Sequence, residues 1–264
     1  MMAAGAGVEV RGVSKSFGVD GKRVTVLDDI SLTIGMGEFV SVIGPSGSGK
    51  STLLKVVAGL LDADSGSVTI DGEPVREASR KKNIGLVPQS PALLPWKTVL
   101  ENVRLPVQIN RAANGKRQLR DPEELLRTFG LGHAIHKHPG QLSGGMQQRA
   151  AIARAFAFDP AIMLMDEPFS ALDEMNRDLQ RIALLDFWQS NRKAVMFVTH
   201  SVPEAIMLSD RVVVMSAHPG RIADVIDIDL PRPRDEDAYA TDAFRDIEAV
   251  VRRSLRAQME QVHV

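Results

Sequence analysis

One glycine-rich stretch limits the folds open to this chain. Its eight residues are Gly44-Pro45-Ser46-Gly47-Ser48-Gly49-Lys50-Ser51, which fit the pattern G-x4-G-K-S. An apolar, β-branched run precedes the stretch at residues 38–43, and apolar residues with helical spacing follow it at residues 50–60. The sequence therefore predicts an α/β domain in which a tight turn joins a buried strand to a helix.

The same turn has the chemistry of a phosphate-binding site. Glycines allow several backbone N–H groups to point inward at phosphate oxygens, and the positive end of the following helix adds to the field. Lys50 can reach the β- and γ-phosphates of a nucleotide, and the Ser51 hydroxyl can bind Mg²⁺. We predict that the nucleotide is bound by Gly44, Pro45, Ser46, Gly47, Ser48, Gly49, Lys50, Ser51 and Thr52. The alternative is a structural turn with one exposed lysine.

Two adjacent acids end a second apolar run. Residues 162–165 are all apolar, and Asp166 and Glu167 follow them directly. Carboxylates at the end of a buried strand are costly unless they are used. Asp166 would hold Mg²⁺ through a water molecule, and Glu167 would polarise the attacking water. The alternative is that the two acids only cap the next segment.

The rest of the chain alternates strand and helix patterns. Residues 8–17 and 24–34 alternate as strands do, and Asp71-Gly72 is a hairpin signal. Nearly all-apolar runs at residues 161–168, 193–200 and 210–217 are typical of a parallel sheet buried on both faces. We expect a single domain over residues 1–264, with a helical subdomain inserted at residues 90–160 and a C-terminal linker and helix at residues 231–264. Within that helix, Phe244, Ile247, Val251 and Leu255 recur at helical spacing.

Composition excludes several classes of protein. With 32 basic and 33 acidic residues, the formal net charge of the 264-residue chain is −1, so a strongly basic nucleic-acid footprint is absent. The chain has no cysteine, which excludes disulfides, thiol catalysis and cysteine-ligated zinc. It has no apolar run of ~20 residues, and its N-terminus lacks the pattern of a secretory signal. We expect a cytosolic protein.

Further motifs resemble those of one family. Residues 142–149 read LSGGMQQR and are similar to the signature LSGGQxQR of ABC transporter ATPases. Gln89 resembles the glutamine of the family's Q-loop, residues 170–173 resemble its D-loop, and His200 resembles its switch histidine. The resemblance extends from about residue 8 to residue 220. It implies a P-loop NTPase core of the ABC ATPase type, with an N-terminal antiparallel β region and a helical insertion subdomain.

The resemblance also implies roles for individual residues. The catalytic residues would be Glu167, His200 and Gln89, and the metal-binding residues would be Ser51, Gln89 and Asp166. Besides Asp166 and the glycine-rich turn, the nucleotide would be bound by Phe17 (against adenine), Ser143, Gly144, Gly145 and Asp173. Two departures from the family pattern are Met146, where glutamine is common, and phenylalanine rather than tyrosine at position 17. We expect the effect of Met146 to be mild, because the resemblance assigns the phosphate contacts to Ser143 and Gly145. At position 17, stacking on adenine survives and only a hydroxyl is lost.

Cofactors and partners follow from the same resemblance. The cofactors would be ATP and Mg²⁺. Two copies of the chain would pair head to tail, so that the signature of each closes over ATP held by the other. The pair would bind integral-membrane permease subunits at the cytoplasmic face of the membrane, as a peripheral ATPase, and would act indirectly with a solute-binding protein.

A narrower resemblance concerns residues 91–99, which read PALLPWKTV. They are similar to a stretch of importers for nitrate, aliphatic sulfonates and taurine, as are residues 218–235. The resemblance implies import of a small anion without naming it, and no additional C-terminal β-domain. The apolar cluster Leu93, Leu94, Pro95 and Trp96 either lines a groove that receives the permease or packs inside the helical subdomain.

Other functions remain as alternatives. A soluble ABC ATPase acting on nucleic acid or the ribosome usually carries long coiled-coil insertions or two ATPase domains, and neither is visible. A P-loop kinase or GTPase would not explain the signature. His133, His136 and His138 have no fourth metal ligand in sight, so we expect a solvated loop.

Overall fold

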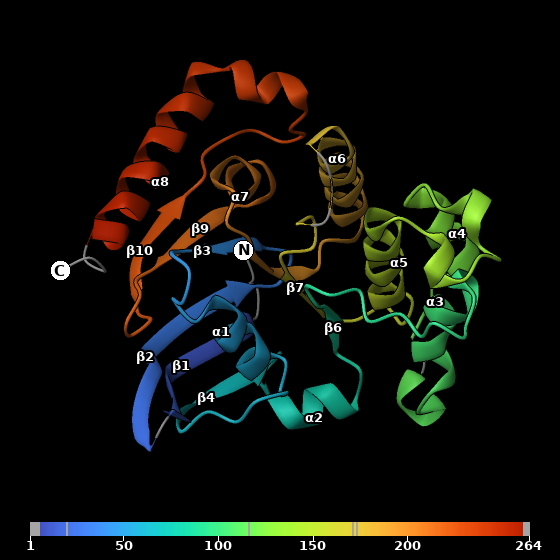
Figure 1. Ribbon diagram of the computed structural model, residues 1–264, viewed down its shortest axis with the longest axis horizontal. Helices are drawn as coiled ribbons and strands as arrows, with labels where there is room; N and C mark the ends of the chain where they lie inside the picture. The colour runs from blue at the N-terminus through green and yellow to red at the C-terminus, as the bar shows by residue number, and fades with distance from the viewer. Residues whose placement is uncertain (1–5, 20, 116, 171, 173, 261–264) are drawn as a thin grey trace.

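Two β-sheets organise the residues described by the computed structural model, which are 6–19, 21–115, 117–170, 172 and 174–260 (Figure 1). The first sheet has the strand order β2-β1-β4-β5 and is antiparallel throughout. Its strands are β1 (Ala6–Val19), β2 (Lys22–Gly35), β4 (Ser65–Ile70) and β5 (Glu73–Pro74). The predicted hairpin turn joins β4 to β5, with φ values of 51° at Asp71 and 77° at Gly72. The predicted antiparallel β region is therefore confirmed.

The second sheet has the strand order β10-β9-β3-β8-β7-β6. Its strands are β3 (Phe39–Ile43), β6 (Ile84–Val87), β7 (Ile162–Asp166), β8 (Ala194–Val198), β9 (Arg211–Met215) and β10 (Ile222–Asp227). Only β10 pairs antiparallel, with β9; the other pairs are parallel. Every residue of β3, β7 and β8 is buried, because both faces of the sheet are covered. The apolar runs thus form the parallel sheet that they predicted.

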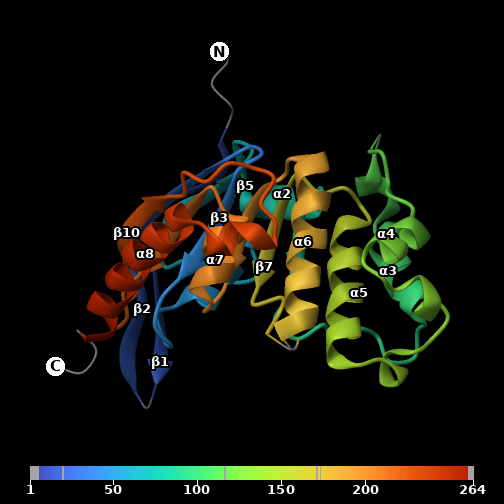
Figure 2. The same cartoon turned by 90° about the horizontal axis from the view of Figure 1, so that it is seen from above.

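Helices and the first sheet cover the two faces of the parallel sheet. Helix α1 (Lys50–Val57) lies between the two sheets, where Leu53 and Leu54 share a core with Val10 of β1 and Val42 of β3. The opposite face is covered by α5 (Gly144–Phe156) and α6 (Glu174–Asn191), which lie side by side in Figure 2. Near β9, α7 (Val202–Leu208) and α8 (Asp242–Glu260) enclose a third apolar core. The glycine-rich turn is therefore held between two packed layers.

The described residues between β6 and β7 form helices and no strand. They include α3 (Val99–Gln108), η1 (Arg111–Asn114), α4 (Pro122–Thr128), η2 (Gly132–Ala134), η3 (Pro139–Gln141) and α5. The short helix α2 (Val75–Arg80) precedes β6. Figures 1 and 2 both place α3 and α4 at the end of the molecule farthest from α8. Among the described helices, none is long and apolar enough to cross a membrane.

The connection to the C-terminal helix is held firmly against the body of the protein. Arg234, 5% exposed, lies within hydrogen-bond distance of backbone carbonyls on both sides of β9 and β10, those of Ile206, Met207, Ser209, Ile228 and Leu230. Burial lowers the pKa of its guanidinium to about 10. The 3-10 helix η4 (Glu236–Ala240) follows, and then α8 buries Phe244 and Val251. The predicted apolar stripe of this helix is confirmed.

Replacing Arg234 with methionine should therefore weaken the fold. The variant leaves five buried carbonyl groups without their shared donor, so we expect the free energy of unfolding to fall by about 2–4 kcal/mol. Urea denaturation followed by circular dichroism measures this change. Arg253→Met on the exposed side of α8 is the matched control and should change it by less than about 0.5 kcal/mol. Equal stability of the two variants would contradict the anchoring role of Arg234.

Candidate active site

The predicted site residues follow the carboxyl ends of four neighbouring parallel strands. The glycine-rich turn follows β3, Gln89 follows β6, Glu167 follows β7 and His200 follows β8. Because these strands are parallel and adjacent, their carboxyl ends lie at the same edge of the sheet. The topology thus gathers residues that are far apart in the sequence.

The glycine-rich turn curls over the start of α1. Gly49 has φ of 85°, and a β-carbon there would lie 2.7 Å from the Leu27 side chain, so only glycine fits. Lys50 bends back over the turn, and its Nζ donates hydrogen bonds of 3.0 Å to the carbonyls of Gly44 and Pro45. Burial lowers the pKa of the Lys50 ammonium, and the charges of Glu167 and Asp166 oppose that change. The Lys50 ammonium and the N-terminus of α1 thus both lie against the backbone of the glycine-rich turn.

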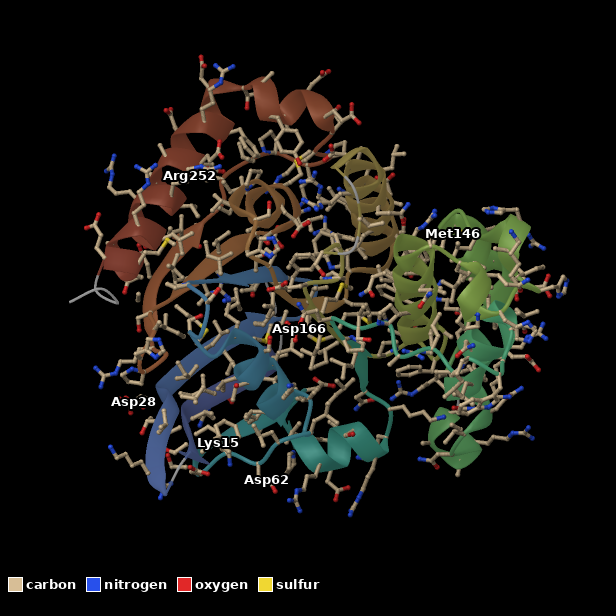
Figure 3. All side chains as sticks on the ribbon, viewed as in Figure 1. Lys15, Asp28, Asp62, Met146, Asp166 and Arg252 are labelled. Carbon is tan, nitrogen blue, oxygen red and sulfur yellow. The ribbon has the colours of Figure 1, made fainter. Side chains whose placement is uncertain are left out.

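Ser51 and Asp166 bring two oxygen ligands together beside this turn. The Ser51 hydroxyl donates a 2.9 Å hydrogen bond to Oδ1 of Asp166, which Figure 3 shows at the centre of the molecule. Burial raises the pKa of Asp166, and the charge of Glu167 acts in the same direction. A hydroxyl beside a carboxylate is a set of hard oxygen ligands of the kind that Mg²⁺ prefers. The residues present therefore fit a magnesium ion.

Glu167 lies between two side chains that can donate hydrogen bonds. Its Oε2 atom is 3.3 Å from Nε2 of Gln89 and 3.4 Å from Nδ1 of His200. Its backbone has φ of 45°, which is uncommon for glutamate, and its N–H donates to the carbonyl of Val198 at 2.9 Å. Backbone held in such a conformation is often found at functional sites. The structure thus brings together the three residues for which the resemblance implies catalytic roles, Gln89, Glu167 and His200.

Phe17 lies near the C-terminal end of β1. It pairs with Val24 of β2, two residues before Val26, and Val26 contacts the position of Gly49. Its ring is 38% exposed, and Nζ of Lys15 lies 5.7 Å from the ring centroid. An aromatic face is therefore accessible near the glycine-rich turn.

The signature residues lie apart from this cluster. Ser143 is the N-cap of α5, where its Oγ accepts a 3.3 Å hydrogen bond from the N–H of Met146, and Ser143 and Gly144 are exposed. Figure 3 shows Met146 well to the right of Asp166, so the start of α5 and the acidic pair are separated in space. Leu172 packs against Gly145, whose β-carbon would lie 2.2 Å from it. The predicted nucleotide ligand Asp173 lies outside the described residues.

A turn after β9 packs against the glycine-rich turn. The sequence did not predict this contact. The Gly220 N–H donates to the carbonyl of Val26 at 2.9 Å, and its carbonyl accepts from the N–H of Asp28 at 3.0 Å. A β-carbon on Gly220 would lie 2.2 Å from the carbonyl oxygen of Ser48. Arg221 next to it forms an ion pair with Asp28 at 2.5 Å. The only signal was the Pro219-Gly220 dipeptide, which indicates a turn but not its neighbour.

Three buried or partly buried side chains hold the segment around Gln89, from Pro88 to Thr98. Asn102, fully buried in α3, accepts from the N–H of Leu94 at 2.7 Å and donates to the carbonyls of Leu94, Lys97 and Thr98. From α5, Gln148 donates to the carbonyl of Pro88 at 3.1 Å. Arg154 donates to the carbonyls of Pro91 and Ala92, both at 2.7 Å. These residues were also missed, because nothing in the local pattern identifies their distant partners.

This rigid segment presents Trp96 to solvent. The indole is 70% exposed, whereas Leu93 of the same cluster is partly buried against the core of α3 and α5. Packing of Trp96 inside the helical layer, one of the two alternatives from the sequence, is therefore wrong for the chain as described. The tryptophan remains accessible to a partner.

The three histidines before the signature are exposed. His133, His136 and His138 lie in and around η2 and η3, near the surface of the helical layer. Among the residues that the structure describes, no group of three or more His, Asp or Glu side chains is arranged to hold a metal ion.

A family comparison agrees with this geometry. Residues 27–170 match the ABC transporter family, a stretch that contains the phosphate-binding turn, the signature and the acidic pair. The fold and the site define a P-loop ATPase, and the chain belongs to the ABC transporter family, in which ATP hydrolysis is coupled to transport.

Individual relatives cover most of the chain. It is 46% identical over 228 residues to an uncharacterized ABC transporter ATP-binding protein of Methanocaldococcus jannaschii, covering 86% of this chain and 84% of the relative. It is 42% identical over 240 residues to the aliphatic sulfonates import ATP-binding protein SsuB of Bacillus cereus, covering 91% and 92%. The bicarbonate transport ATP-binding protein CmpC of Synechocystis sp. is 42% identical over 230 residues, which are 86% of this chain but 34% of CmpC.

A solved structure has the same fold. The dimeric, post-hydrolysis state of the ATP-binding cassette MJ0796 bound to ADP and Pi is similar with a TM-score of 0.75 and 32% sequence identity. The similarity covers 85% of this chain and 100% of that chain. The predicted fold class is therefore confirmed.

The role of Gly220 leads to a prediction about nucleotide binding. Gly220→Ala forces a β-carbon against the Ser48 carbonyl and should displace the phosphate-binding turn. We expect the Kd for ATP to rise about ten-fold, because displacements below 1 Å already weaken a preorganised site. Isothermal titration calorimetry measures the change. Gly140→Ala, at an exposed position with no atom within 4 Å of the new β-carbon, is the control and should bind ATP normally. An unchanged Kd for Gly220→Ala would contradict the supporting role.

Proposed function

We propose that this chain is the ATP-binding and ATP-hydrolysing subunit of an ABC importer for a small organic or inorganic anion. The observation that carries the proposal is the position of the Glu167 carboxylate. It lies between Gln89 and His200 and directly follows Asp166, which pairs with Ser51 of the phosphate-binding turn. A candidate base, two polar side chains and a pair of metal ligands thus lie together at the carboxyl edge of the parallel sheet.

The nucleotide would be held by residues at the edges of both sheets. The backbone N–H groups of residues 44–52 and the Lys50 ammonium would bind the phosphates, and Phe17 would stack on adenine. Ser51, Gln89 and Asp166, the last through water, would hold Mg²⁺. When bound, this ion neutralises charge that develops on the phosphate oxygens.

Glu167 would serve as the general base. Its carboxylate takes a proton from the water that attacks the γ-phosphate, while Gln89 and His200 orient the carboxylate and the reacting groups from either side. His200 is more exposed than Glu167, with 64% against 22% of the side chain, so its ring has room to contact the γ-phosphate. In this proposal Glu167 accepts the proton, and Gln89 and His200 orient the groups on either side of it.

A second copy of the chain would complete the site. Ser143, Gly144 and Gly145 lie at the N-terminus of α5, where the first two are exposed and the third is buried. This helix end suits an anion, but the three residues lie apart from the acidic pair of their own chain. We infer that they and Asp173 act on nucleotide held by the partner copy, giving two composite sites. The dimeric state of the similar MJ0796 cassette supports this pairing.

We propose the following domain organisation for the subunit. Residues 1–264 form one ABC ATPase domain, residues 90–160 form a helical subdomain inserted in it, and residues 231–264 form the C-terminal linker and helix. The run of helices between β6 and β7 and the carbonyl contacts of Arg234 support these divisions.

Trp96 would anchor the membrane permease. An exposed tryptophan on a loop fixed by buried hydrogen bonds is a typical interface anchor. The loop is joined to Gln89 by only a few residues, so docking and hydrolysis would be linked. The subunit would lie peripherally at the cytoplasmic face of the membrane, and a solute-binding protein would deliver the anion to the permease.

The class of solute is inferred from relatives. SsuB is named for import of aliphatic sulfonates and CmpC for transport of bicarbonate. We propose an anion of this kind, such as nitrate, a sulfonate or taurine. The alternative, a soluble ABC ATPase acting on nucleic acid or the ribosome, has less support because the formal net charge is −1 and because these relatives are transport proteins.

Removal of the base tests the proposed function. Glu167→Gln keeps the size and hydrogen bonding of the side chain but cannot accept the proton, so we expect hydrolysis to fall by ~10²–10⁴-fold while ATP binding persists. Phosphate release and size-exclusion chromatography with ATP measure turnover and accumulation of a closed dimer. Glu124→Gln, exposed on α4, is the matched control and should be active. Normal turnover in Glu167→Gln would assign the base to another residue.

Docking through Trp96 leads to a separate prediction. Trp96→Glu places a charge in the proposed contact, so binding of the permease should weaken by about 2–4 kcal/mol and uptake should fall. ATP binding should be unchanged, because the phosphate-binding turn is untouched. Leu60→Glu, at an apolar residue that is 65% exposed after α1, is the control. Co-purification of the permease, uptake and ATP affinity are measured together, and retained co-purification would exclude the anchoring role.

A further inference from the structure

Glu204 is a buried acid that the proposed chemistry does not use. It lies in the first turn of α7 and is only 3% exposed. Its spacing from Ser201 predicts a capping box, in which its side chain would return to the N-cap residue. Only half of that box forms, because Ser201 accepts from the N–H of Glu204 at 3.4 Å. The Glu204 carboxylate instead accepts a hydrogen bond from the hydroxyl of Thr199.

Thr199 carries this contact to both sides of His200. Its Oγ1 donates to Glu204 and accepts from the N–H of Ser201 at 3.1 Å, while its own N–H donates to the carbonyl of Val42 at 3.3 Å. The backbone on each side of His200 is therefore fixed. The histidine ring itself is free of these contacts and points to Oε2 of Glu167.

Two positive charges on α6 act on the carboxylate of Glu204. Burial raises its pKa, whereas the hydrogen bond from Thr199 and the charges of Arg181 and Arg177 favour the ionised form. Arg177 lines the same small cavity as Glu204, Glu167 and His200. It also donates a 2.8 Å hydrogen bond to the carbonyl of Leu172. Arg177 thus lines the cavity beside Glu204 and also contacts the segment that packs against the signature helix.

We propose that Glu204 and Thr199 are positioning residues for hydrolysis: together they hold the backbone of His200 so that its ring meets Glu167. The proposal rests on the role assigned to His200 above. A residue that only capped α7 would not need the contact with Thr199, because Ser201 already provides the cap.

The test compares variants of Thr199 and Glu204 in the 264-residue chain with Mg²⁺ and ATP. Thr199→Val and Glu204→Ala should lower kcat roughly 10- to 100-fold, as expected for loss of a hydrogen bond to a charged group, with the Kd for ATP unchanged within about two-fold. Thr199→Ser keeps the hydroxyl and should restore most of the rate. Because both residues act through one contact, the double variant should be no slower than Glu204→Ala alone. Thr128→Val on α4, whose hydroxyl contacts only its own helix, is the matched control.

Thermal unfolding separates positioning from stability. A normal kcat in Thr199→Val would overturn the proposal. So would an equal loss of kcat in Thr199→Ser, or a loss of kcat that is accompanied by weaker ATP binding and a lower Tm. If Glu204→Ala does not fold, Thr199→Val and Thr199→Ser decide the question alone. His200→Ala is measured in parallel. A normal kcat for His200→Ala would reject the role of His200 itself, whereas slow turnover for His200→Ala with normal turnover for Thr199→Val would reject only the positioning inference.

Discussion

Burial of both faces of the parallel sheet determines where the rest of the protein can be polar. Every side chain of β3, β7 and β8 is buried, and the one charged residue within these strands, Asp166, is the last residue of β7. The other charged groups of the site follow the strands. The turn after β3 binds phosphate in our proposal, Glu167 follows β7 directly, and His200 lies two residues after the end of β8. The turn after β9 supports the first turn from behind. One edge of one sheet therefore carries nearly all the chemistry of the chain.

The fold could be predicted from the sequence wherever local pattern and environment agree. The apolar runs that became β7, β8 and β9 have few alternatives, because only a doubly covered strand buries every side chain. The connection before α8 is different. Its prolines and arginines predict a polar linker, but Arg234 is buried because carbonyl groups distant in the sequence surround it. Sequence spacing does not show such partners.

The site divides in the same way. The glycine-rich turn and Glu167 could be predicted because each follows an apolar strand, whereas Gln89 and His200 were predicted only from the resemblance to the ABC family. The structure brings Gln89 and His200 within hydrogen-bond range of Glu167. Gly220 and Glu204 could not be predicted. The first is required by a carbonyl of Ser48 more than 170 residues away in the sequence, and the second prefers Thr199 to the nearby cap because the hydroxyl is buried beside it. Local rules describe what a residue can contact, and packing decides which contact forms.

The two tryptophans of the chain occupy opposite environments. Trp188 is 1% exposed and packed between Phe39 and the guanidinium groups of Arg192 and Arg232, whereas Trp96 is 70% exposed. An indole in water emits at longer wavelength than one in a rigid apolar site, because water dipoles relax around its excited state. The protein therefore carries two optically distinct reporters without any label. Emission of Trp188, at shorter wavelength, reports whether the core is folded. Emission of Trp96, at longer wavelength, reports whether a partner covers the loop that Asn102 holds in place.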